Sequence, residues 1–408
     1  MREAPSHGRR RRTPGGPASS GGSEPLYAAL DLGTNNCRLM IASLHNSQFR
    51  IVEAFSRIVR LGEGMTHSGA LSERAMERAL KALKICAERI EKRGVARVRA
   101  VATQACRAAR NGRDFIARVE HETGLKLTII SPQEEAHLSV MGCASLLDGR
   151  DVKPPARAAL VMDVGGGSTE LSWVELERAP APLSSAVSDP SSARPGAGDD
   201  SPPSRRPERG ELAVSDIDTA QMAAQAGALR MARHMPRPRY WISLPVGVVN
   251  LAERFPEPEN GDARAWFEGM VSEVMATVRA FTAPEPLRPH FDCGEAYIVG
   301  TSGAITSLAG MHLGLERYDR SKVDGLWMSH DHCRGVIDRL LDLGRAGREL
   351  EPCIGRDRAD LVLAGAAILE AVVRLWPCTR LRVADRGLRE GLLLSMGRKK
   401  TRRRRRRK

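Results

Sequence analysis

Two hydrophobic periodicities alternate along this chain. Short apolar or alternating runs predict strands, and longer segments whose apolar residues recur every three or four positions predict helices. The predicted strands lie at residues 49–55, 95–102 and 127–130, from residue 211, and at residues 240–244. The predicted helices lie at residues 72–90 and 114–123, from residue 131, and at residues 219–234, 264–281, 329–343 and 358–375. Because strands and helices alternate, an α/β fold is predicted.

Two further apolar runs, in residues 27–36 and 159–168, end in nearly the same turn. Each places an Asp (Asp31 or Asp163) at the strand end, followed by one apolar residue, glycine and small polar residues. This pattern predicts a strand, a tight turn and a second strand. Glycine lets the backbone approach a ligand, turn N–H groups bind anions, and a neighbouring Asp can hold hydrated Mg²⁺. One such turn is usually only a turn, but the pair predicts a phosphate chain bound from both sides of a cleft.

A third glycine turn lies in residues 296–309, which read as a strand, a turn with Gly300, Ser302 and Gly303, and a helix. Such a turn delivers N–H groups at a helix N-terminus and is a candidate phosphate contact. Simple helix initiation after a strand explains this pattern equally well.

Composition changes the picture at the ends and in the middle of the chain. Residues 1–24 are rich in Gly, Ser, Pro and Arg, and residues 178–210 contain seven Pro and seven Ser in a stretch with little apolar periodicity. Both segments are predicted to be disordered, the second as a loop inserted after the second glycine hairpin. The rest of the 408 residues, 42% hydrophobic over the whole chain, can form two ordinary domains.

Several function classes are disfavoured by what the sequence lacks. No apolar window is long enough to span a membrane, and the basic N-terminus does not run into a secretory signal core. The eight cysteines are scattered without a C-x-x-C pair, which is typical of reduced thiols in a cytoplasmic protein and supports neither a zinc site nor a disulfide framework. P-loop, nucleophile-elbow and H-E-x-x-H motifs are also missing.

The net charge of +14 lies entirely in the two ends of the chain. Residues 1–12 carry a net charge of +4, and residues 398–408 contain ten Lys or Arg and no acid, so the body between them is formally neutral. Like-charge blocks usually form disordered, nonspecific tails. These two tails are expected to attract RNA, DNA or another polyanion, including the protein's own substrate.

Hydrolysis also needs a group that deprotonates or orients water. In the segment at residues 131–136, Ser131 as N-cap and Glu134 three residues later predict a capping box, which leaves Glu135 free to point about 100° away around the helix. The helix dipole is expected to keep this first-turn carboxylate ionised, as a base requires. A solvated first-turn acid is the alternative interpretation. Arg107, directly after a predicted strand, is a candidate to bind two phosphate oxygens.

These motifs together resemble the exopolyphosphatase and guanosine pentaphosphate phosphohydrolase family, within the actin, sugar kinase and Hsp70-like superfamily. The resemblance covers about residues 26–397 apart from the insertion. The matching segments are residues 29–35, 103–115, 130–136, 162–171, 244–247, 300–303 and 385–391.

The resemblance implies two ribonuclease H-like lobes, at residues 25–157 and 158–397, with the active site in the cleft between them and a possible homodimer. Glu135 would be the catalytic base for water attack on a terminal phosphoanhydride, and Asp31 and Asp163 would position Mg²⁺. The residues that would hold the phosphates are Gly33, Thr34, Asn35, Arg107, Gly165, Gly166, Gly167 and Ser168. The segment Arg389-Glu390-Gly391 matches a family feature whose chemical role does not follow from the sequence.

Two departures from the family pattern stand out. Thr34-Asn35-Asn36 replaces the common Ser-Asn-Ser but keeps hydroxyl and amide donors. The chain ends soon after Gly391, without the extra helical domains that help some longer members hold polyphosphate, and its basic tail is expected to take over part of that role.

The expected activity is Mg²⁺-dependent release of orthophosphate from inorganic polyphosphate. Guanosine pentaphosphate is the alternative substrate, and no residue separates the two. A phosphotransferase of the same superfamily would need an acceptor hydroxyl and a full nucleotide pocket, whereas residues 131–136 favour water as the acceptor. A non-enzymatic polyanion-binding protein is supported by the tails alone.

Overall fold

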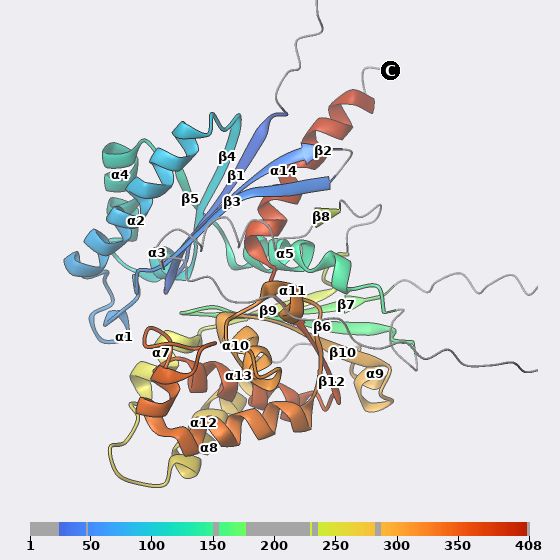
Figure 1. Cartoon of the computed structure of the whole chain (residues 1–408). Coiled ribbons are helices and arrows are strands. Elements are labelled where there is room, and N and C mark those ends of the chain that lie inside the picture. The colour runs from blue at the N-terminus through green and yellow to red at the C-terminus, as the bar shows by residue number, and fades with distance from the viewer. Residues whose placement is uncertain are drawn as a thin grey trace, which may run out of the picture.

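Two six-stranded sheets dominate the fold (Figure 1). The computed structural model describes residues 24–45, 48–149, 155–176, 229–230, 236–281 and 287–405. The first sheet has the order β5-β4-β1-β2-β3-β8. Its strands are β1 (Leu26–Leu32), β2 (Asn36–His45), β3 (Gln48–Ile58), β4 (Arg97–Ala102), β5 (Leu127–Ile129) and β8 (Leu229–Arg230). β1, β2 and β3 are antiparallel neighbours, whereas β4 and β5 run parallel to β1.

The second sheet repeats this arrangement with the order β11-β12-β10-β6-β7-β9. Its strands are β6 (Ala158–Val164), β7 (Thr169–Glu175), β9 (Tyr240–Leu244), β10 (Ala296–Thr301), β11 (Trp327–Ser329) and β12 (Arg380–Ala384). β6, β7 and β9 are antiparallel, and β10 and β12 run parallel to β6. β6 therefore corresponds to β1, and the predicted α/β fold with two ribonuclease H-like lobes is confirmed.

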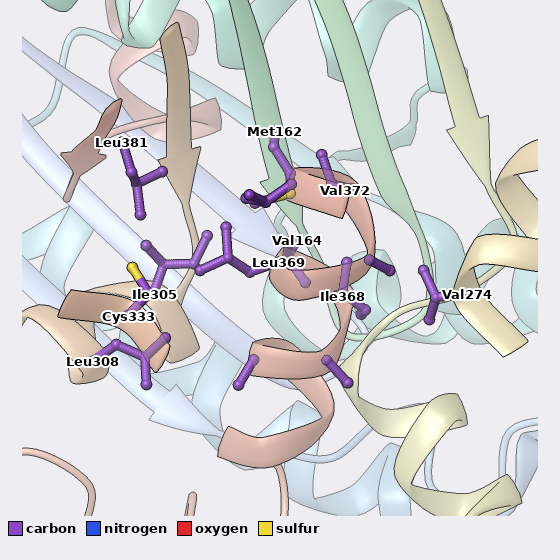
Figure 2. Packing of buried hydrophobic residues seen from close by; sticks show 14 of the residues in the cluster. Met162, Val164, Val274, Ile305, Leu308, Cys333, Ile368, Leu369, Val372 and Leu381 are labelled. Carbon is purple, nitrogen blue, oxygen red and sulfur yellow. The ribbon is translucent and has the colours of Figure 1, made fainter. Parts of the chain in front are cut away.

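Helices cover the outer face of each sheet (Figure 1). The first lobe has α1 (Met65–Ser68), α2 (Glu73–Lys92), α3 (Gln104–Ala108) and α4 (Gly112–Thr123). The second has α7 (Val248–Arg254), α8 (Ala263–Ala280), α9 (Arg288–Asp292), α10 (Gly303–His312), α11 (Arg320–Val323), α12 (His330–Leu350) and α13 (Val362–Leu375). In the second core, Ile368, Leu369 and Val372 of α13 pack with Met162 and Val164 of β6 (Figure 2). Across the described residues, every helix is too short or too polar to span a lipid bilayer.

Local sequence explains where these helices begin. Ser72 accepts a hydrogen bond from Ala75 N at 3.3 Å and caps α2, whose buried stripe includes Leu80, Leu83 and Cys86. In α5 (Pro132–Gly142), the predicted cap forms, because Ser131 Oγ accepts from Glu134 N at 3.1 Å. The Glu134 carboxylate does not complete a capping box and pairs instead with Arg99.

The last helix, α14 (Leu388–Arg405), corrects the lobe boundaries. The sequence assigned residues 158–397 to the second lobe, but Leu392, Leu393 and Met396 pack with Tyr27 and Phe49 of the first. α14 and α5 therefore lie together between the two sheets (Figure 1). The helical backbone also continues through residues 398–405, which the sequence predicted to be disordered. Arg and Lys are good helix formers, and a helix that is already nucleated extends at little cost.

Glycine fixes how closely α5 and α14 approach. A Cβ added at Gly142 would lie 2.0 Å from Gly387 O, and one added at Gly391 would lie 2.0 Å from Leu138 O. The two helices thus pack backbone against backbone, which holds the α14 N-terminus against the helix whose first turn contains Glu134 and Glu135.

Several sequence predictions fall partly or wholly outside the described residues. These are the disordered segments at 1–24 and 178–210, the strand from 211, and the helix at 219–234, of which only β8 is described. Elements that the sequence did not predict include α7, α11, β11, β12 and α14.

Candidate functional site

A cleft of about 930 Å³ lies between the lobes. Both glycine hairpins, the start of α10, and the turn between β12 and α14 line it. Of the sequence-predicted site residues, the lining includes Asp31, Gly33, Thr34, Asn35, Glu135, Asp163, Gly165, Gly166, Gly167, Ser168, Ser302 and Gly303. Arg107 and Gly300 are outside this set.

The two hairpin turns have the same backbone geometry. Gly33 N donates to Asn36 O at 2.9 Å, and Gly165 N donates to Ser168 O at 2.9 Å. The turns do not face each other across open space, as the sequence suggested, but touch. A Cβ added at Gly166 would lie 2.9 Å from Thr34 Cβ. Glycine is therefore needed there for close approach of the two turns as well as for any ligand.

The segment at residues 244–247 supports the second turn from behind. Val248 N and Val249 N, in the first turn of α7, donate to Gly165 O and Gly166 O at 3.0 and 2.8 Å. Asn250 Nδ2 donates to Gly167 O at 3.0 Å. These bonds use the carbonyl groups of the turn and fix its conformation.

The two predicted metal ligands sit opposite different partners. Asp31 is paired in register with Arg38 across β1 and β2, and Asp163 with Glu170 across β6 and β7. Burial raises the pKa of Asp31 to about 6, against the lowering effect of Arg38 and Arg389. Burial also raises the pKa of Asp163, whose carboxylate accepts a hydrogen bond from Ser139 of α5.

Glu135 points into the cleft and is only 8% exposed. Arg107 Nη1 donates to Glu135 Oε2 at 3.0 Å and to Ile130 O at 2.8 Å. The helix dipole was expected to keep Glu135 ionised, but burial and the neighbouring Glu170 raise its pKa well above the ordinary range, more than Arg107 lowers it. Glu135 is thus a carboxylate with a high proton affinity, as a general base near neutral pH requires.

Arg107 has a different position from the one expected. Besides Glu135 and Ile130, its guanidinium donates to Gln104 Oε1 from Nε and Nη2 at 3.2 and 2.7 Å. Four hydrogen bonds to protein acceptors hold it beside the base and away from the cleft lining. The structure therefore places Arg107 where it orients Glu135, and its predicted role in binding phosphate oxygens stays a prediction.

Glu170 is a buried carboxylate behind the cleft lining that acts on Glu135 and that the sequence analysis did not single out. Burial and Asp163 raise its pKa to about 7, although Ser243 Oγ donates to Glu170 Oε1 at 2.8 Å. The sequence contained a signal for it. Glu170 follows Ser168 by two residues in the second hairpin, and strand alternation puts two such residues on the same face.

The third glycine turn contributes less than predicted. Ser302 Oγ accepts from Ala304 N at 3.1 Å and caps α10, and both Ser302 and Gly303 line the cleft. Gly300 does not, because it lies inside the core, where a Cβ would come within 2.8 Å of Ile305 Cδ1. Gly300 is thus a packing glycine of β10 and no phosphate contact.

Nine arginines line the cleft against six acidic residues, although the body of the chain is formally neutral. The arginines are Arg38, Arg57, Arg60, Arg78, Arg317, Arg320, Arg358, Arg386 and Arg389. Sequence totals could not reveal this local excess, since the arginines come from both lobes. An excess of one sign of charge in a cleft concentrates ligands of the opposite sign.

Arg60 connects the first phosphate turn to the second lobe. Its φ of 44° is unusual for a residue other than glycine. Its N–H and that of Val59 donate to Asn35 O at 3.0 and 2.8 Å, and its guanidinium forms two hydrogen bonds with Asp360 at 2.7 and 3.0 Å. A second interlobe contact joins Gly64 N and Thr66 Oγ1 to Glu253 at 2.8 and 2.6 Å. We call these contacts the interlobe latch.

The oxygen donors near the two turns fit Mg²⁺. Within the described ranges, the buried atoms Asp31 Oδ1, Thr34 Oγ1 and Asn35 Oδ1 have no hydrogen-bond partner. Nowhere in the described part of the chain do three or more His, Cys, Asp or Glu side chains form a cluster that could hold a metal ion by themselves. Mg²⁺ commonly binds one or two carboxylates and completes its shell with water and substrate phosphates, and Asp31 and Asp163 match that pattern.

The match to known proteins is extensive. The model of the Ppx/GppA phosphatase family matches residues 40–198 and 233–400. A Ppx/GppA family member from Aquifex aeolicus is 25% identical with a TM-score of 0.62, covering 92% of this chain and 98% of that one. An exopolyphosphatase-like protein is 25% identical over the same shares with a TM-score of 0.68. An exopolyphosphatase from Cytophaga hutchinsonii, 20% identical over 91% of this chain and 97% of its own, has a TM-score of 0.68 and supports the fold.

Proposed function

Because this chain belongs to the Ppx/GppA phosphatase family, we propose that it is an exopolyphosphatase that releases orthophosphate from the ends of inorganic polyphosphate. The observation that carries this proposal is the position of Glu135. It is a buried carboxylate with a raised pKa, held by Arg107 and directed into a cleft lined by two anion-binding turns.

The chemistry follows from these positions. The turn N–H groups and cleft arginines bind the phosphates, and Glu135 takes a proton from water as the water oxygen bonds to the terminal phosphorus. The bridging P–O bond breaks, and its electron pair stays on the terminal oxygen of the shortened chain. The products are orthophosphate and a chain one unit shorter. Mg²⁺ held by Asp31 and Asp163 would neutralise charge on the phosphate oxygens when bound.

Guanosine pentaphosphate remains the second candidate substrate, since cleavage of its terminal 5′ phosphate needs the same groups. One observation favours room for a nucleoside. The cleft wall also includes the apolar residues Ile354, Leu361 and Val362, which a phosphate chain alone does not require.

Phosphate release from long polyphosphate, short polyphosphate and guanosine pentaphosphate, measured side by side at several Mg²⁺ concentrations, tests the proposal. We expect release from both polyphosphates to rise with Mg²⁺ and to exceed release from guanosine pentaphosphate. Release from guanosine pentaphosphate alone would replace the proposed substrate. No release from any of the three at any Mg²⁺ concentration would contradict hydrolysis.

Removal of residues 398–408 is expected to raise KM for long polyphosphate and leave short substrates unaffected. α14 has 18 residues and extends about 27 Å from the cleft at 1.5 Å per residue, so only a long chain can reach both the cleft and the basic end. The increase should be larger at low salt, because contacts with a polyanion weaken as salt rises. Steady-state kinetics with polyphosphates of graded length measures KM for each length. Equal increases in KM for long and short chains would contradict the expected role of the tail.

A further inference from the structure

The segment at residues 385–391, whose role the sequence left open, runs alongside the carboxylates of the site. Residues 385–387 connect β12 to α14, residues 388–391 form the first turn of α14, and residues 385–390 all line the cleft. Both parts together are called the turn segment below. A Cβ added at Gly387 would lie 4.0 Å from Asp163 Oδ2 and 3.3 Å from Thr301 Oγ1. The turn segment thus reaches the second predicted metal ligand directly from the second lobe.

Most charged side chains of the turn segment are occupied by partners. Asp385 Oδ2 accepts from Tyr318 OH at 2.6 Å, and Arg386 Nε donates to Asp324 Oδ2 at 2.9 Å. Glu390, 1% exposed, accepts from Arg320 Nη2 and from Gly387 N, both at 2.9 Å. Although burial opposes it, the charges of Arg389 and Arg320 lower the pKa of Glu390 to about 2, so Glu390 stays ionised and keeps its bonds to Arg320 and Gly387.

Arg389 differs from the other charged residues of the turn segment. It lines the cleft and is partly buried, yet its guanidinium makes no hydrogen bond or ion pair with any other part of the chain that the structure describes. Its charge acts on Asp31, at the end of β1. Its charge also acts on Glu390, but the direct ion pair of Glu390 is with Arg320. A guanidinium held in a partly desolvated cleft without a direct ion pair is costly unless an anion pairs with it. Its planar fork suits phosphate oxygens.

The support behind Arg389 is rigid. Arg389 lies in the first turn of α14, between Gly387 and Gly391. Gly387 contacts Gly142 of α5, and Gly391 contacts Leu138 of α5. α5 carries Glu135 in its own first turn. The proton acceptor and the Arg389 side chain therefore project from two helices whose relative position is fixed by backbone contact.

We propose that Arg389 is a catalytic residue that donates hydrogen bonds to the non-bridging oxygens of the phosphoryl group under attack. This inference deepens the proposed function and rests on it. The guanidinium stabilises the charge on those oxygens, and this stabilisation is stronger in the transition state than in the ground state. The ion pairs of Glu390 and Arg386 serve to hold the turn segment that presents it.

Kinetics of R389Q, R389K and R57Q test this role. We expect R389Q to lower kcat by about 100-fold or more, as is typical when one donor to a developing oxyanion is removed. R389K should recover part of this loss, since lysine keeps the charge but not the fork. R57Q removes a charge of the same sign from β3 in the same cleft, so it should raise KM with little effect on kcat.

Binding measurements separate this role from a structural one and from the activity itself. Calorimetry with Mg²⁺ should show that R389Q loses more affinity for orthovanadate, which mimics the five-coordinate phosphorus of transfer, than for orthophosphate. If thermal unfolding shows that R389Q is not folded, the ratio of vanadate affinity to phosphate affinity is measured for R389K instead. A vanadate-to-phosphate affinity ratio within about twofold of wild type, or an unchanged kcat, would overturn the inference. If the wild-type protein is inactive but R389Q changes the ratio, the proposed function fails while the anion-binding role of Arg389 stands.

Discussion

Replacement of Glu135 by glutamine is expected to lower kcat for phosphate release by a factor of about 100 or more, with substrate affinity retained. Glutamine has nearly the same shape and still offers an oxygen to Arg107, whose Nη1 lies 3.0 Å from Glu135 Oε2. It cannot accept a proton from water. The loss should therefore appear in turnover and not in the equilibrium binding of tripolyphosphate, which calorimetry measures separately.

The adjacent residue provides a matched control. Glu134 is also in the first turn of α5, but its side chain is 42% exposed, pairs with Arg99 of β4 and does not line the cleft. E134Q removes the same charge one position away and should keep turnover close to that of wild type. Unchanged phosphate release by E135Q would reject Glu135 as the base, whatever the result for E134Q.

Substitution of Gly142 by alanine is expected to lower the free energy of unfolding by about 1–3 kcal/mol. Alanine is favoured over glycine in a helix by about 1 kcal/mol, but here the new Cβ would lie 2.0 Å from the backbone atom Gly387 O. Neither backbone can yield without moving α5 away from α14. The steric cost should therefore outweigh the helix preference, and denaturant unfolding measures the difference.

Gly335, on the exposed face of α12, is the control for this substitution. Nothing lies within 4 Å of a Cβ added there, so G335A should raise stability by about 0.5–1 kcal/mol. Opposite signs for the two variants would identify the contact between α5 and α14 as the cause. A G142A protein at least as stable as wild type would contradict the backbone contact.

The sequence predicted those parts of the protein that local pattern determines. The glycine hairpins, the cap at Ser131 and most long helices follow from residues close in sequence, and the structure has each of them. Gly300 shows where local pattern is ambiguous. Its turn resembles a phosphate contact, but the packing of Ile305 against it, which only the tertiary fold determines, makes it a core residue.

Contacts between distant segments could not be predicted in this way. α14 lies in the last part of the chain, yet its apolar residues pack against the first sheet, a contact that periodicity does not encode. The basic cleft has the same origin. Arginines such as Arg57 and Arg358 have no distinguishing signal in the sequence and gather only when the lobes meet. Arg348 makes the same point, since it is 1% exposed although its residue type is usually found at the surface.

The interlobe latch couples the binding of phosphate at the first turn to the relative position of the two lobes. The backbone of Thr34 and Asn35 is held by residues 59–62, and Arg60 in turn holds Asp360 of the other lobe. A phosphate chain that binds better to the closed arrangement must favour closure by the same free energy that closure adds to its binding. A phosphate chain bound at the first turn would thus favour the arrangement in which Arg60 contacts Asp360, and its departure would remove that preference.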